Sequence, residues 1–426
     1  MRVLRNATLP DGRERDVAID GEKIGAVGSE LDGDTLCDLR GKWLFPGMID
    51  VHVHFRQPGF PEKETWRTGS RAAAVGGVTT VVDQPNTDPP TVDGPSFDRK
   101  AGIAADSLVD WGLNGGVTPD WQPAELFDRP LFALGEVFLA DSTGDMGIGR
   151  SLFEAALERA KAAGVVTTVH AENAEYFEER VTDRTDPGAW SEYRPAQAEV
   201  VAIAQAVEAA NELDTPIHIA HASTPEGIDR AAAAGATTEV TPHHLLLSTD
   251  DSEELGTFGR MNPPLRDETR RQAVYDRVGD GTVDVIATDH APHTREQKDT
   301  DIWSAPSGVP GVETALPLLL REVRAGRLDA ARVRDLTARN PARIFDLPSK
   351  GRIQPGADAD LVVVDPADAR EIRGEDLHGK SDWTPFEGMT GIFPELTMVR
   401  GSVVWESPDP TNAEGSFGDR VGKNVR

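Results

Sequence analysis

The sequence contains very little cysteine and no long apolar run. Cys37 is the only cysteine among 426 residues, so no intrachain disulfide can form. Because no run of 18 or more apolar residues is present, we expect no membrane span. The first residues become polar at once and reach Pro10-Asp11-Gly12, without the apolar core of a secretion signal. We therefore expect a cytoplasmic protein.

Basic residues are scarce relative to acidic ones. The chain has 44 Lys and Arg against 72 Asp and Glu, which gives a formal net charge of −28. This excess argues against nucleic acid or an anionic membrane as a partner. The acidic residues are dispersed along the chain, and Arg greatly outnumbers Lys. We interpret this pattern as the surface of a halophilic protein, with an acidic mesophilic protein as the alternative.

The middle of the chain alternates apolar β-rich runs with helical stretches. This alternation is typical of parallel βα units. Eight such units predict a (β/α)8 TIM barrel. The alternative is an open doubly wound sheet, but the first run ends in His-Val-His and not in a glycine-rich phosphate turn. The runs cover 49–54, 79–84, 109–113, 131–139, 165–170, 217–221, 237–242 and 283–289, and candidate helices cover 149–163, 196–213, 312–324 and 329–339.

Short β-rich runs return at both ends of the chain, for instance at 17–20, 351–353 and 360–364. The simplest assembly is an α/β protein in which the two ends form one small domain beside the barrel. We predict a β-sandwich domain from 1–45 plus 346–405, a barrel over 46–345, and a tail over 406–426 that is either loose or packed as an arm.

Histidines and carboxylates recur at the ends of these runs. His52 and His54 lie two residues apart, so both side chains point to the same face of a strand. The carboxyl ends of barrel strands converge on one site. Four histidines and two carboxylates from five runs can hold two divalent ions, for which zinc is the first choice and manganese or cobalt would also suit. The predicted ligands are His52, His54, Glu136, His170, His221 and Asp289.

Several motifs resemble those of the dihydroorotases, within the amidohydrolase superfamily. The first is Asp50-x-His52-x-His54-x-Arg56-x-Pro-Gly. The resemblance implies the reversible cyclisation of N-carbamoyl-L-aspartate to dihydroorotate in pyrimidine synthesis, with a binuclear metal centre and a small-molecule substrate. The later motifs are Gln84-Pro-Asn86-Thr, His170-Ala-Glu, His221-Ala-Ser-Thr, Asn262-Pro-Pro-Leu-Arg, Asp289-His-Ala-Pro-His293 and Pro306-Ser-Gly308.

The same resemblance implies a role for each matching position. Asp289 would be the catalytic general acid and base as well as a metal ligand. His54 would lie at both the metal and the substrate. The substrate carboxylate would be held by Arg56, Asn86 and His293, and the ring amide groups by Asn262 and the backbone around Ser307 and Gly308. A guanidinium suits a carboxylate because it can grip both oxygens.

The fourth run departs from the pattern of many relatives, which bridge the two metals with a carboxylated lysine. Here the corresponding position is Glu136, which is already an anion with two oxygens. Asp141, just beyond the run, is the alternative bridge. We favour Glu136 because it lies in the predicted strand.

Other readings stay open at this point. An allantoinase or hydantoinase would share the metal ligands, but its substrate lacks the carboxylate that Arg56 would bind. A non-catalytic barrel that serves as a scaffold would be expected to have lost ligands. We expect His218 to be structural and His290 to brace its loop, whereas Glu172 either orients a histidine or is a solvated loop carboxylate. The sequence leaves open whether the chain forms a homo-oligomer.

Overall fold

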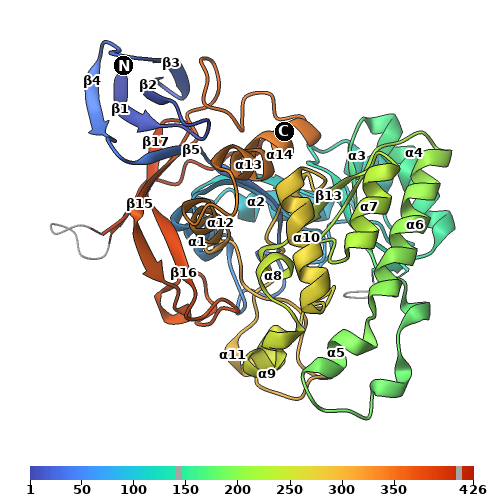
Figure 1. Ribbon diagram of the computed structural model, residues 1–426. Helices are drawn as coiled ribbons and strands as arrows, with labels where there is room; N and C mark the ends of the chain where they lie inside the picture. Colours follow the sequence, from blue (N-terminus) through green and yellow to red (C-terminus); the bar gives the residue numbers. More distant parts are fainter. Residues whose placement is uncertain (141–145, 409–414) are drawn as a thin grey trace.

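The computed structural model describes residues 1–140, 146–408 and 415–426 (Figure 1). Eight parallel strands form its centre, in two ladders that are each ordered along the chain. Parallel bridges from Gly115 to Leu134 and from Val53 to His290 join the two ladders into a closed ring. The predicted (β/α)8 barrel is therefore confirmed. Its strands are β6 (Met48–Val53), β7 (Val78–Asp83), β8 (Asp110–Leu113), β9 (Leu134–Leu139), β11 (Thr167–Ala171), β12 (Ile217–Ile219), β13 (Thr237–Val240) and β14 (Val285–Ile286).

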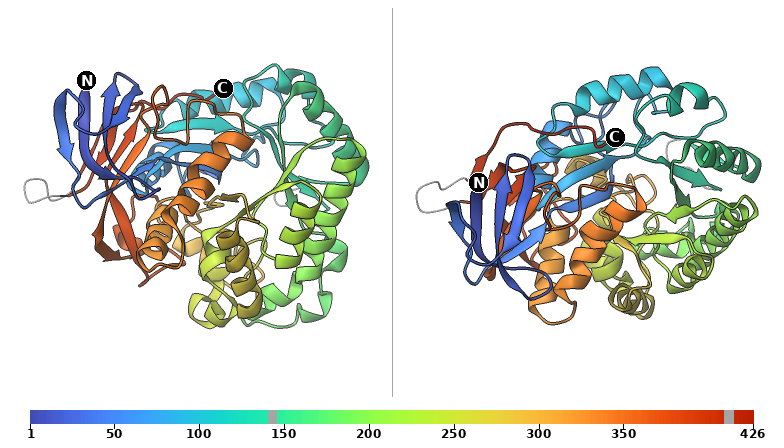
Figure 2. Two further views of the ribbon diagram at one scale, coloured as in Figure 1. Left: turned by 45° about the horizontal axis from the view of Figure 1, so that its top comes forward. Right: turned by 90° about the horizontal axis from the view of Figure 1, so that it is seen from above.

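Helices surround this ring (Figure 2). The expected helices at 149–163 and 196–213 form within one residue of their predicted ends. The cap chemistry explains such limits: the Asp267 side chain accepts from the Arg270 amide at the start of one helix, and Gly281 ends that helix in the left-handed region. The outer helices are α1 (Trp66–Val75), α2 (Gly94–Ala104), α3 (Pro123–Phe127), α4 (Arg150–Ala163), α6 (Ala196–Glu212), α7 (Pro225–Ala233), α10 (Glu268–Asp280), α12 (Ala315–Arg324), α13 (Ala330–Arg334) and α14 (Asn340–Ile344).

Short helices lie in the loops that follow the strands. They are α5 (Gly188–Tyr193), α8 (Pro242–Leu246), α9 (Ser252–Leu255) and α11 (Arg295–Lys298). Figure 1 shows α5, α9 and α11 gathered at one end of the barrel. None of the helices in the described parts of the chain is long and apolar enough to cross a membrane.

Three strands, β12, β13 and β14, end two or more residues before the ends that the sequence predicts. The seventh run ends at Val240, because Thr241 caps α8 and Pro242 opens it, so the predicted extension to residue 242 is wrong. His221 and Asp289 lie beyond the ends of β12 and β14. The φ angle is +33° at His221 and +46° at Asp289. Both residues therefore sit at turns out of the barrel, where the chain changes direction at the mouth.

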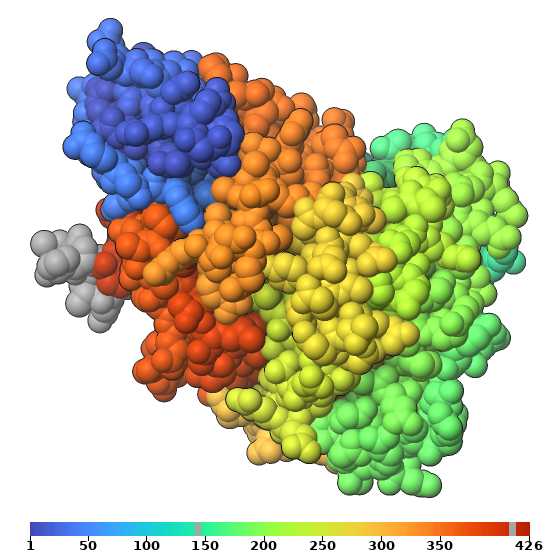
Figure 3. All heavy atoms as spheres, in the orientation of Figure 1, coloured from blue at the N-terminus to red at the C-terminus, as the bar shows by residue number. Residues whose placement is uncertain are grey.

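Both ends of the chain contribute strands to one nine-stranded sheet of the β-sandwich domain. Leu361 pairs with Pro46 and Thr8 pairs with Trp43, which joins the C-terminal strands to the N-terminal ones. Figure 3 shows the two ends of the sequence, in blue and in orange-red, side by side on the surface. The predicted run at 351–353 forms no strand. The strands are β1 (Arg2–Thr8), β2 (Glu14–Asp20), β3 (Lys23–Gly28), β4 (Asp34–Asp38), β5 (Trp43–Pro46), β15 (Leu361–Glu371), β16 (Thr390–Val399), β17 (Ser402–Glu406) and β18 (Ser416–Phe417).

The described part of the tail is a packed arm. The Trp111 amide donates to the Lys423 carbonyl at 2.9 Å, and the Val425 amide donates to the Trp111 carbonyl at 2.9 Å. The last residues therefore pair alongside β8, through a parallel bridge between Trp111 and Asn424. The residue limits of the three parts of the chain stay a prediction.

Candidate active site

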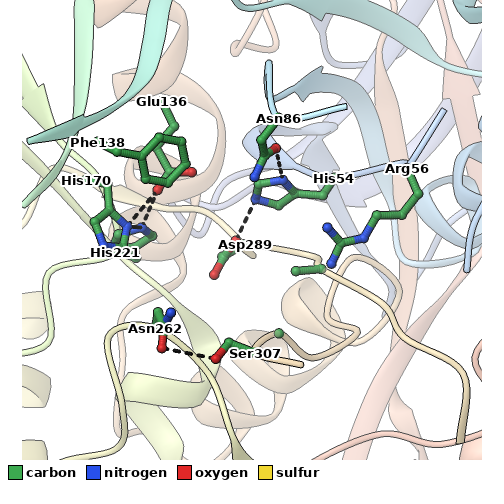
Figure 4. Close-up of a pocket in the computed structure, with 12 residues that line it drawn as sticks. His54, Arg56, Asn86, Glu136, Phe138, His170, His221, Asn262, Asp289 and Ser307 are labelled. Atoms are coloured by element: carbon green, nitrogen blue, oxygen red, sulfur yellow. Dashed lines mark hydrogen bonds and ion pairs between the residues drawn. The ribbon is translucent and has the colours of Figure 1, made fainter. Parts of the chain in front are cut away.

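A polar pocket opens at the carboxyl ends of the barrel strands (Figure 4). Ten of the predicted site residues line it, and the other two, His52 and His293, are not among the lining residues. Phe138 and Ala291 are the two lining residues that the sequence did not predict. The pocket is lined by His54, Arg56, Asn86, Glu136, Phe138, His170, His221, Asn262, Asp289, Ala291, Ser307 and Gly308.

Two groups of possible metal ligands meet at one carboxylate. Glu136 joins His52 and His54 in one group and His170 and His221 in the other. One oxygen, Oε1, lies 2.6 Å from His221 Nε2 and 3.0 Å from His170 Nδ1. The other, Oε2, lies 3.5 Å from His52 Nε2. The two oxygens of Glu136 thus face the two pairs of histidines.

The backbone before Glu136 explains how this carboxylate reaches the centre. Gly135 has a φ of +143°, and a Cβ at this position would collide with Thr168 on the neighbouring strand β11. Only glycine lets β9 and β11 approach so closely. Burial opposes ionisation of Glu136, but the positive charge of His52 and hydrogen bonds from the other histidines hold the pKa of Glu136 well below its ordinary value.

The first histidine pair has the geometry of metal ligands. His52 Nδ1 lies 2.6 Å from Glu239 Oε1, while the buried His52 Nε2 has no hydrogen-bond partner within the described residues. An imidazole oriented through one nitrogen, with its other nitrogen directed toward further carboxylates, is the usual arrangement of a metal-binding histidine. His54 Nδ1 lies 2.8 Å from Asn86 Oδ1, which orients the second imidazole. This donor set fits a divalent cation.

Glu239 is a site residue that sequence reasoning missed. It is buried at the end of β13 and also contacts His218 Nε2 at 3.1 Å and accepts from the His221 amide at 3.2 Å. Burial opposes its ionisation, but His52 and His218 lower the pKa of Glu239 to about 2. The only signal in the sequence was a carboxylate inside a β-rich run. His218, which we expect to be structural, contacts the Glu239 carboxylate and so helps to hold it.

Asp289 completes the first group. Its Oδ1 lies 3.0 Å from His54 Nε2 and 3.5 Å from His52 Nε2. Burial opposes ionisation, but the neighbouring histidines hold the pKa of Asp289 below its ordinary value. Asp50 fixes the preceding residue by accepting from the Thr288 amide and hydroxyl at 3.0 and 2.6 Å. The Asp50 carboxylate thereby ties β6 to the turn that carries Asp289.

The second histidine pair is supported by another buried carboxylate. Glu172 Oε2 lies 3.3 Å from His170 Nε2 and accepts from the Arg194 guanidinium at 2.5 Å. Because Glu172 is fully buried, the alternative of a solvated loop carboxylate is wrong. Burial opposes its ionisation, but Arg194 and His170 lower the pKa of Glu172 well below its ordinary value.

The opposite side of the pocket carries a cation. Arg56 has a φ of 64°, its Nε donates to the Pro292 carbonyl at 3.2 Å, and one of its terminal nitrogens lies 3.1 Å from His293 Nε2. Burial lowers the pKa of Arg56 to about 10, so the guanidinium stays charged at neutral pH. No carboxylate in the described parts of the chain lies within ion-pair distance of Arg56. This charge is therefore available to an anionic ligand.

Two loops, one that carries Asn262 and one that carries Ser307, close the side of the pocket that carries Arg56. Asn262 Oδ1 accepts from Ser307 Oγ at 3.1 Å and from Trp190 Nε1 at 3.2 Å. His293 Nε2 lies 2.9 Å from the Ser307 carbonyl. His290 braces its loop as expected, because the Gly311 amide donates to His290 Nδ1 at 3.1 Å. Asp141, the alternative bridging residue, lies outside the described residues.

The comparisons with known proteins agree with this geometry. Residues 43–404 match the model of the amidohydrolase family. A dihydroorotase of Halobacterium salinarum is 62% identical over 97% of this chain and 99% of its own length. A dihydroorotase of Methanosarcina mazei is 43% identical over 99% of this chain and 97% of its own. The solved L-hydantoinase of Arthrobacter aurescens superposes with a TM-score of 0.93 at 28% identity and covers 99% of both chains.

The chain belongs to the amidohydrolase family. Within that family its sequence groups with the dihydroorotases, since its identity to them is well above its identity to the hydantoinase whose fold it shares.

Proposed function

We propose that this chain is a dihydroorotase, a metal-dependent cyclic amide hydrolase that interconverts N-carbamoyl-L-aspartate and (S)-dihydroorotate in pyrimidine synthesis. One observation carries the proposal: Glu136, shared by two groups of histidines, faces the charged Arg56 across one pocket. A hydrolytic centre thus lies opposite a site for an anion. The relatives at 62% and 43% identity bear the same name over nearly their whole length.

The metal centre follows from the donor set. We assign His52, His54 and Asp289 to one divalent ion, His170 and His221 to a second, and Glu136 to both. A pair of such ions, when bound, would polarise a ring carbonyl and make water a better nucleophile at neutral pH. Two ions and zinc in particular are our proposal, since manganese or cobalt would suit the same ligands.

Asp289 is the proton carrier in this proposal. Its carboxylate lies beside both histidines of the first group and is held ionised, so it can accept a proton from the attacking water. It then returns that proton to the ring nitrogen as the amide bond breaks. In ring closure the same carboxylate acts in the reverse order.

The substrate is oriented from the opposite wall. Arg56 grips the substrate carboxylate with two hydrogen bonds, and Asn86 and His293 complete that contact. Asn262 and the backbone at Ser307 and Gly308 contact the ring amide groups. His54 lies between the two halves, because it reaches Asp289 through one nitrogen and Asn86 through the other.

The alternatives fit these residues less well. Allantoin and simple hydantoins carry no carboxylate to match Arg56, although the fold is shared with a hydantoinase. A non-catalytic scaffold has no use for two complete groups of ligands around one glutamate. The cytoplasmic location stays a prediction, and the oligomeric state stays open.

The test is a side-by-side assay of the purified protein with N-carbamoyl-L-aspartate, dihydroorotate, allantoin and hydantoin, with metal content measured on the same sample. We expect turnover of the first two, little of the others, and two divalent ions per chain. Preferred turnover of hydantoin or allantoin would refute the assignment, and a metal-free active sample would refute the proposed centre.

A further inference from the structure

Lys298 is a buried cation whose hydrogen-bond partners are all backbone carbonyls. Its side chain is fully buried at the end of α11, behind the wall of the pocket. Its Nζ donates to the carbonyls of Arg260, Pro306 and Gly308 at 2.9, 2.9 and 3.2 Å. No acidic partner of Lys298 is found in the residues that the structure describes.

The three carbonyl oxygens around Nζ favour the charged form of the Lys298 amine. An ammonium has three donors, which match the three carbonyls one to one. A neutral amine would have two donors and would turn its lone pair toward a carbonyl oxygen. The arrangement is costly, because burial lowers the pKa of Lys298 well below its ordinary value, and the charges of Arg260 and Arg56 add to that effect. A buried charge of this kind calls for an explanation beyond simple packing.

The three carbonyls belong to the two loops that close the substrate side. One loop carries Asn262, and the other carries Ser307 and Gly308, all of which line the pocket. The same loops touch directly, since the Gly308 amide donates to the Arg260 carbonyl at 3.0 Å and the Ser307 hydroxyl donates to Asn262. Lys298 therefore joins the two loops immediately behind the groups that face a ligand.

Lys298 is itself held at both ends. The Thr257 hydroxyl donates to the Lys298 carbonyl at 2.7 Å, and Thr294 caps α11. The ring of Trp383 lies 5.6 Å from Nζ, and Trp383 Nε1 donates to the His293 carbonyl at 2.8 Å. The ammonium thus has one fixed position relative to both loops and to the backbone of His293.

We propose that Lys298 is a positioning residue that clasps these two loops, so that Asn262, Ser307 and Gly308 are held in the arrangement that binds the substrate ring. This inference rests on the proposed function for the identity of the substrate. Since the clasp is made to backbone atoms on the side of Arg56, its loss should loosen substrate binding while the metal ligands on β9 and β11 stay in place.

The test compares Lys298→Met with Lys380→Met in the metal-loaded enzyme. Methionine keeps an unbranched apolar side chain but removes the ammonium. Lys380 is the matched control, because it is exposed and its Nζ donates to a single backbone carbonyl, that of Pro61. We expect Lys298→Met to raise KM for dihydroorotate ~10-fold or more with a smaller change in kcat, and Lys380→Met to leave both unchanged.

Two further readouts separate the clasp from a general loss of structure. Hydrogen exchange, measured without substrate, should become faster in peptides over 257–265 and 302–312 of Lys298→Met and stay unchanged over β9 and β11. Metal content should equal that of the wild type. If Lys298→Met does not fold, Lys298→Gln, which keeps two N–H donors, is subject to the same test and should give a smaller change in the same direction.

Unchanged exchange in both loops would overturn the proposal, as would loss of metal or a fall in kcat at constant KM. The exchange measurement needs no substrate, so a wild-type protein that fails to turn over dihydroorotate refutes the proposed function while the clasp is still decided by exchange.

Discussion

The two sides of the pocket treat charge in opposite ways. On the metal side, which is formed by the two groups of histidines around Glu136, each histidine lies beside a carboxylate, and the buried glutamates Glu239 and Glu172 support two of these histidines from behind. On the other side, Arg56 and Lys298 contact backbone carbonyls and a histidine, with no carboxylate at ion-pair distance among the described residues.

The difference teaches what each side can bind. A surplus of carboxylate and imidazole ligands attracts cations, whereas buried cations without acidic partners attract an anion. The contrast is the more informative because the whole chain carries a net charge of −28. Local arrangement and not overall charge therefore decides that this acidic protein can accept an anionic substrate.

The largest loss of activity is expected from a change at Glu136, because both groups of proposed metal ligands share this residue. Glu136→Ala should lose at least one metal ion and nearly all activity, because two close cations repel strongly without a shared anion. Metal analysis and turnover of dihydroorotate check this, and activity should not depend on bicarbonate in the wild type. Asp141→Ala serves as the control and should keep both ions. Loss of metal from that control with two ions left in Glu136→Ala would transfer the bridge to Asp141.

A change of one charge beside the same centre should act on chemistry. Asp289→Asn should keep the fold but reduce turnover in both directions by about 10²–10⁴-fold, because one carboxylate serves as base in one direction and acid in the other. Circular dichroism, metal content and kcat are measured together. A variant with full metal content and near-wild-type kcat would contradict the role of Asp289.

Removing the charge of Arg56 tests the opposite side of the pocket. Arg56→Met should weaken recognition of the substrate carboxylate by about 2–5 kcal/mol in kcat/KM and leave metal content unchanged, since a charged hydrogen-bonded partner is lost. Arg13→Met, at the surface beside Asp11, is the matched control. If kcat/KM for dihydroorotate stayed near that of the wild type, the carboxylate is bound elsewhere.

The smallest effect is expected from a change at Glu239, which supports the proposed ligand His52. Glu239→Gln should weaken metal binding about 10–100-fold, because an amide cannot hold the His52 imidazole as a carboxylate does. Competition with a chelator measures the affinity. Glu322→Gln removes another buried carboxylate, one that accepts from Tyr275 at 2.7 Å, and should leave metal affinity unchanged. Equal affinity in both variants would show that Glu239 has no part in the centre.

Much of the architecture was determined by the sequence itself. Eight β-rich runs with helices between them define the barrel because hydrophobic periodicity and connection length are local properties. The precise ends were less predictable: Pro242 opens a helix where a strand was expected, since the cap at Thr241 competes with the strand for the same backbone groups.

The proposed ligand residues could also be predicted from the sequence, because most of them lie at the end of a run and strand ends converge in a barrel. The tertiary structure alone decided which carboxylates support them. Glu239 looks like any charged residue in the chain, and the sequence left two alternatives for Glu172; only their burial against His52 and His170 gives them a role. Lys298 is the same case, because contacts to the carbonyls of distant residues depend on how loops pack and leave no pattern along the chain.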